Sequence, residues 1–240
     1  MKCCRRKNQT WSRLLRMREK KPIDLSRLAT REPPQVYKEL VAALVRAGAL
    51  KEAVVSRKGL PFKLTNPVDV LTNTKISAKP YARVLVEHGA RIAAAGHGSY
   101  LDGVLRALAE RGITEATDFL LSLWDVRPPL SEGTLWLAGE ALATINDKSA
   151  DLRIIDLCRR HSGRSLKMLL RTLARRRRPE GFQVLIEKLA DPELVGHAIN
   201  ALWKYGDPAA LPHIERISTV PGTYAHREKA KALEKLRDGP

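Results

Sequence analysis

A short pattern recurs through the C-terminal two thirds of this 240-residue chain and constrains its fold more than any other feature. In each copy an apolar helical stretch ends in a small residue followed by leucine, and a turn and a second apolar stretch come next. The leucines are Leu108, Leu142, Leu173, Leu202 and Leu233. They lie 34, 31, 29 and 31 residues apart, a period typical of stacked helix pairs, because one pair cannot bury its own apolar face. The sequence therefore predicts an all-α solenoid.

The turns between the stretches carry residues that suit helix starts. Pro179 and Pro208 fall where a helix could begin, at its first turn. Asp147 and Asp207 lie in turns, where a carboxylate could cap the following helix. These positions favour a break between two helices in each copy.

The fourth copy resembles a HEAT-like repeat of the short bacterial form named after phycobilin lyases. The matching residues are Ala201, Leu202, Gly206, Asp207, Pro208, Ala210, Leu211 and Pro212. The first two copies lack the Asp-Pro turn, and the third replaces it with four arginines. The resemblance covers roughly residues 100–240. It implies a right-handed α-solenoid of about five to six HEAT-like helix pairs and says little about function. An irregular helical bundle is the alternative.

The sequence divides into three parts. These are a basic arm over 1–31, an N-terminal helical region or set of degenerate repeats over 32–99, and the HEAT-like repeat domain over 100–240. Within the middle part we expect helices over 33–50 and 78–96, separated by a loop-rich linker with one short helix after Pro67.

Positive charge is concentrated in two segments. The chain has 43 Lys and Arg against 26 Asp and Glu, a net charge of +17. Residues 1–31 and 153–178 each carry a net +9, so the rest of the chain is close to neutral. A surface adapted only for solubility mixes both signs. The segregation therefore predicts a surface for an anionic partner.

The second basic segment could form a row of cations. If residues 165–178 are one helix, Lys167, Arg171, Arg175 and Arg178 share a face, with about 6 Å between steps of four residues. Such a row could meet successive phosphates, and the guanidinium fork suits bidentate contact. The candidate polyanion-binding residues are Arg159, Arg160, Arg164, Lys167, Arg171, Arg175, Arg176, Arg177 and Arg178, with Arg5, Arg6, Lys7, Arg13 and Arg16 of the arm. The alternatives are a solvated face and arginines that complement a helix C-terminus.

The arm and the cysteines leave several interpretations open. The arm could bind nucleic acid, bind another partner, or remain a solvated tail. Cys3 and Cys4 beside basic residues could also accept acyl chains in a eukaryotic host, although a membrane partner is not the expectation. Three cysteines give no disulfide framework, and Cys158 is expected to be a buried apolar residue. With no apolar signal segment at the start, we expect a cytoplasmic protein, or a nuclear one in a eukaryote.

No catalytic residue, cofactor or metal site is expected. The six histidines are scattered without an HExxH pattern, and no Gly-x-Ser-x-Gly motif is present. The segment GHGSYLDG over 96–103 is expected to end one helix and, through Ser99, to cap the next.

The favoured function is non-enzymatic. A helical-repeat scaffold would dock DNA, RNA or a ribonucleoprotein through phosphate contacts. The alternative is a protein–protein adaptor or assembly factor that binds an acidic partner protein. The third interpretation is a DNA glycosylase of the alkylpurine type, a class also built from HEAT-like repeats. Residues of the required types are Trp124, Asp125, Trp136, Trp203, Tyr205 and Asp207, but no catalytic motif aligns.

Overall fold

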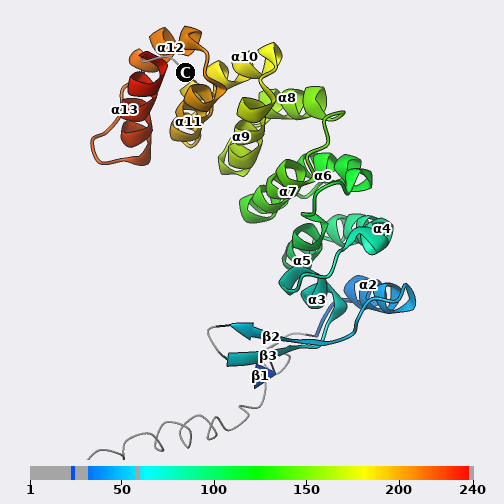
Figure 1. The fold of residues 1–240 in the computed structure, drawn as a ribbon. Helices are drawn as coiled ribbons and strands as arrows, with labels where there is room; N and C mark the ends of the chain where they lie inside the picture. The colour runs from blue at the N-terminus through cyan, green and yellow to red at the C-terminus, as the bar shows by residue number, and fades with distance from the viewer. Residues whose placement is uncertain (1–22, 25–31, 58–59, 238–240) are drawn as a thin grey trace, which may run out of the picture.

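The computed structural model describes residues 23–24, 32–57 and 60–237, and most of these residues are helical (Figure 1). The all-α prediction is confirmed in its main point. One exception lies near the N-terminal end, where a small three-stranded sheet is present. The expected residues of the basic arm (Arg5, Arg6, Lys7, Arg13 and Arg16) lie outside the described residues.

The sheet corrects the expectation of a loop-rich linker. Its strands are β1 (Ile23–Asp24), β2 (Ala53–Arg57) and β3 (Leu60–Leu64), in the order β1–β3–β2. β2 runs antiparallel to β3 with Val55 opposite Phe62, and β1 runs parallel to β3. Valine and phenylalanine favour strands, whereas Pro61, the second residue of β3, counts against one. Because of this proline, the sequence pattern alone does not predict the hairpin.

The helices expected in the N-terminal region are confirmed. They are α2 (Gln35–Arg46), α3 (Pro67–Asn73) and α4 (Ala82–Ala94), the last preceded by a 3₁₀ turn at Lys79–Tyr81. α3 begins at Pro67 because the side chain of Asn66 accepts a hydrogen bond from the Val68 N–H at 2.9 Å.

Beyond α4 the helices form two curved rows. The remaining helices are α5 (Gly98–Leu108), α6 (Thr117–Ser122), α7 (Glu132–Ile145), α8 (Asp151–Arg160), α9 (Lys167–Arg176), α10 (Pro179–Glu187), α11 (Val195–Tyr205), α12 (Leu211–Glu215) and α13 (Tyr224–Arg237). Helices α5, α7, α9, α11 and α13 each contact the next one and lie on the inside of the curve (Figure 1). We call them the inner row. Helices α4, α6, α8, α10 and α12 pack behind them and are called the outer row.

The recurring leucines lie in the core between the rows. Leu108, Leu142, Leu173 and Leu202 are buried, and Leu233 is half-buried against the same core. The hydrophobic core is one continuous cluster that runs from Tyr37 to Leu236, and Cys158 lies inside it, as expected. The repeating leucine therefore marks the contact between an inner helix and its outer partner.

A left-handed residue follows four of these leucines, always four positions later. The residues are Gly112, Asn146, Arg177 and Gly206, with φ values of 88°, 65°, 53° and 80°. Glycine and asparagine are the residues that tolerate this conformation at a helix end. The third turn uses an arginine instead, so it carries a conformational cost that the other three avoid.

The turns also test the expected caps. Asp207 accepts a hydrogen bond from the Ala209 N–H at 2.9 Å and caps the 3₁₀ turn at Pro208–Ala210, as expected. Asp147 accepts from the Ser149 N–H at 2.9 Å, one turn ahead of α8, so it shapes the loop and does not cap the helix. The expectation for Ser99 is wrong: α5 begins at Gly98, and Ser99 lies within its first turn.

Candidate functional site

The basic segment over 159–178 separates into two groups in the structure. The acid-paired group is Arg159, Arg160, Arg176 and Arg178. The α9 cations are Arg164, Lys167, Arg171, Arg175 and Arg177. None of the α9 cations has a carboxylate within 4.0 Å among the residues that the structure describes.

The expected single helix over 165–178 is wrong. α9 ends at Arg176, Arg177 adopts the left-handed conformation, and Arg178 is extended as the residue before α10. The left-handed residue turns the chain away from the helix axis. Arg178 is therefore separated from the face that Lys167, Arg171 and Arg175 share.

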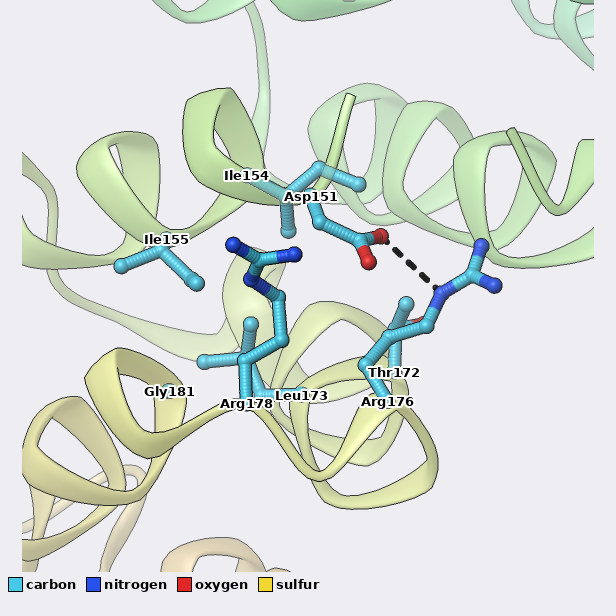
Figure 2. Close-up of a pocket in the computed structure, with 8 residues that line it drawn as sticks. All are labelled: Asp151, Ile154, Ile155, Thr172, Leu173, Arg176, Arg178 and Gly181. Carbon is cyan, nitrogen blue, oxygen red and sulfur yellow. Dashed lines mark ion pairs between the residues drawn. The ribbon is translucent and has the colours of Figure 1, made fainter. Parts of the chain in front are cut away.

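Arg176 lies between helices, and Arg178 lies beside it with 41% of its side chain exposed. Figure 2 shows both side chains beside Ile154 and Ile155 of α8. Nε of Arg176 is 3.0 Å from Oδ1 of Asp151, and each of the two side chains is 10% exposed. This buried ion pair links the start of α8 to the end of α9, which gives Arg176 a structural role.

Arg159 and Arg160 close α8 on the outer row and face acids. Arg160 is 2.8 Å from Asp156 and 3.5 Å from Asp125. Arg159 is 3.8 Å from Glu187. Since these cations already have acidic neighbours, we leave the acid-paired group out of the candidate site.

The α9 cations occupy the open side of the inner row. α9 packs against α8 and α10 behind it and against α7 and α11 at its flanks. On α9, Arg171 and Arg175 are exposed, and Lys167, one turn before Arg171, is half-buried. The spacing of four residues places these three along one face of α9, and α9 itself lies on the inner side of the curve (Figure 1).

The electrostatic effect of this cluster reaches neighbouring groups. Burial and the charges of Arg171 and Arg176 lower the pKa of Arg175. Burial, with the charges of Lys167 and Arg164, lowers the pKa of His197 on α11, despite an opposing effect of Glu228. Like charges held together in this way favour an anion placed among them.

Two local features of the cluster oppose stability. The first turn of α9 has no acidic residue, and Arg164 and Lys167 stand at this positive end of the helix dipole. Arg177 occupies the left-handed position that glycine or asparagine fills in the neighbouring turns. Strain and unfavourable charge of this kind gather at functional sites.

One residue of the candidate site escapes a reading of the basic segment alone. Arg111, in the loop after α5, lines a hollow together with Arg171 and Arg175 of α9. The sequence separates Arg111 from α9 by more than a full repeat. The repeat gives no signal for it either, because the equivalent position in the third repeat, three residues after Leu173, is Arg176, which is not part of the candidate site.

The residues considered for glycosylase chemistry have structural contacts. Trp203 donates a hydrogen bond from Nε1 to Glu228 at 3.1 Å, and Glu228 also accepts one from Asn200 at 2.6 Å. Tyr205 packs against Phe182 with ring centroids 5.1 Å apart. Asp207 caps its turn. The structure thus brings neither Trp136 nor Trp124 to this group, since Trp136 is half-buried on α7 and Trp124 is buried beside α6.

Searches for other kinds of site and for relatives give no match. Among the described residues, no group of three or more His, Cys, Asp or Glu side chains is placed to hold a metal ion. No described helix is both long and apolar enough to cross a membrane. No protein-family model matches the chain, and no match was found among curated proteins or among solved structures.

Proposed function

We propose that this chain is a non-enzymatic α-solenoid of HEAT-like helix pairs that docks a nucleic acid on the inside of its curve. The α9 cations, Arg164, Lys167, Arg171, Arg175 and Arg177, would contact the phosphates. This proposal keeps five of the nine cations that the sequence nominates between 159 and 178.

One observation carries the proposal: the arginines of α8, on the outer row, are paired with acids, whereas three of the four cations of α9, on the inner row, are not. Arg153, Arg159 and Arg160 of α8 each have an acidic partner within 4.0 Å. Lys167, Arg171 and Arg175 of α9 have none among the described residues. A cluster of unpaired cations repels itself, and a polyanion relieves that repulsion.

Phosphate contacts of this kind position a nucleic acid without reading its sequence. The exposed side chains of α9 are cationic, and cations that meet phosphates supply affinity that falls steeply with salt. We therefore expect binding to DNA and RNA with little preference for sequence.

The test compares two triple variants with equal loss of charge. Fluorescence anisotropy of a labelled 20-nucleotide single strand and of its duplex gives affinity across a range of salt concentrations. K167Q/R171Q/R175Q is expected to reduce the slope of log affinity against log salt by about 3. The matched control R153Q/R159Q/R160Q removes three charges from the outer row and is expected to leave the slope nearly unchanged.

Equal effects of the two variants would mean that net charge alone drives binding, and the proposal would fail. It would also fail if the wild-type chain bound neither nucleic acid. A third outcome is an acidic protein that co-purifies in stoichiometric amount after nuclease treatment and is lost in the α9 variant. It would mean that the partner is a protein and not a nucleic acid.

A further inference from the structure

A hollow of about 350 Å³ lies on the inner row, over the C-terminal end of α7. Its lining comes from three consecutive repeats. The residues are Arg111 after α5, Ala143, Thr144 and Asn146 at the end of α7, and Met168, Arg171 and Arg175 on α9. Three of them are arginines and none is an acid, so the hollow is strongly cationic.

The hollow is held in shape by hydrogen bonds across the repeats. Nη2 of Arg175 donates to the carbonyl oxygen of Ala143 at 3.1 Å and to Oγ1 of Thr172 at 3.4 Å. The Gly112 N–H donates to the carbonyl oxygen of Ile145 at 3.1 Å, which fixes the loop that carries Arg111 against α7. The bonds donated by Arg175 orient its guanidinium group, and the bond from Gly112 to Ile145 positions the backbone beside Arg111.

The Arg175–Ala143 and Gly112–Ile145 bonds also reduce the electrostatic repulsion that an anion would meet at the end of α7. The C-terminal end of a helix carries unpaired carbonyl groups and a partial negative charge. At the end of α7, Arg175 donates a hydrogen bond to the carbonyl oxygen of Ala143, and the Gly112 N–H donates one to that of Ile145. The end of α7 is thus partly neutralised before any ligand arrives.

Another hollow of the described structure shows the opposite character. A hollow of about 600 Å³ is lined by residues 162–163, 187–188 and 190–193, among which the acids Glu187, Asp191 and Glu193 outnumber the single cation Lys188. Its acids disfavour a phosphate. The concentration of arginine without acid at the end of α7 is therefore a local property and not a consequence of the net charge of the chain.

We propose that the hollow at Arg111, Arg171 and Arg175 seats one phosphodiester group of the bound nucleic acid. The group would lie between Arg111 on one side and Arg171 with Arg175 on the other, and Asn146 could donate an additional hydrogen bond. This assignment rests on the proposed function and makes it more specific. It requires the nucleic-acid backbone to cross α7 along the curve, whereas the sequence suggested a path along α9.

The test removes one charge at a time. R111Q changes an exposed arginine that lines the hollow, and R106Q changes an exposed arginine of the same region that does not. R111Q is expected to weaken binding about tenfold, as for loss of a charge-assisted hydrogen bond, and R106Q less than about twofold. The anisotropy assay is run with both the single strand and the duplex. A loss confined to one of them identifies the form whose phosphate enters the hollow.

A second measurement separates failure of this site from failure of the proposed function. The dinucleotide dTpdT carries one phosphodiester and is titrated while the arginine Nε–Hε resonances are recorded. The proposal expects the signals of Arg111, Arg171 and Arg175 to shift together. If R111Q and R106Q weaken binding equally, and the shifts fall on Arg164 instead, the chain binds nucleic acid but the hollow does not seat the phosphate.

Discussion

The acid-paired group and the α9 cations come from the same stretch of sequence, yet the structure treats them differently. Arg176 is paired with Asp151 between two helices, and Arg159 and Arg160 face acids on the outer row. Lys167, Arg171 and Arg175, on α9 of the inner row, have no carboxylate within 4.0 Å in the described structure. The comparison shows that a run of arginines can combine a structural ion pair with a surface prepared for a ligand.

The largest expected effect lies in the acid-paired group. D151A removes the partner of a mostly buried arginine, and loss of one member of such a pair costs about 3–5 kcal/mol. Urea denaturation followed by circular dichroism measures the free energy of unfolding. Cys158 provides an independent readout, because its thiol is fully buried and burial raises its pKa to about 12. We expect labelling of this thiol to become faster in D151A.

The control for D151A is D156A, which removes an exposed partner of Arg160. Exposed pairs contribute at most about 1 kcal/mol, so D156A is expected to stay close to the wild type. If both variants lose the same stability, Asp151 and Arg176 do not form a special pair.

An intermediate effect is expected for R177G, which should increase stability and weaken nucleic-acid binding. R177G relieves the left-handed conformation and should increase the free energy of unfolding by about 1 kcal/mol. The same change removes an exposed cation and should weaken nucleic-acid binding several-fold. Gain of stability with loss of binding is the signature of a residue retained for function.

N146G is the matched control for stability only, because Asn146 holds the equivalent position and already tolerates the left-handed region but also lines the proposed phosphate site. Its stability gain is expected to be smaller than that of R177G. Weaker binding without any gain in stability for R177G would remove the argument from strain.

The smallest effect is expected at Glu140. This half-buried acid holds the position on α7 that Arg171 holds on α9, two residues before the leucine. E140Q removes a negative charge beside the proposed path and should raise affinity about two- to fivefold, within the range of one weak ion pair. The comparison is E187Q on the outer row, for which no change is expected in the anisotropy assay.

Much of the helical framework could be predicted from the sequence. The leucine period placed the helix ends, because the same buried contact recurs in every unit, and Pro179 and Pro208 marked helix starts correctly. The hairpin at 53–64 could not be predicted in this way, since Pro61 contradicts the strand pattern and pairing with β2 overrides it.

The candidate site could be predicted only in part. The density of arginine located the segment, but its division depended on one backbone angle. A helix that continued through Arg177 would have placed Arg178 beside Arg175. The left-handed turn instead directs Arg178 toward Ile154 and Ile155. Arg111 joins the site through tertiary packing, which a local charge count does not detect.

The bond from Gly112 to Ile145 has a mechanical consequence. It fastens the loop carrying Arg111 to the end of α7, while Arg175 is fastened to the same end from the other side. Bending or straightening of the row at α7 would therefore have to strain these two bonds before it could change the gap between the two guanidinium groups. A phosphate bound between the two guanidinium groups would link the two sides of this gap. Binding at this one site would therefore make the inner row stiffer at α7.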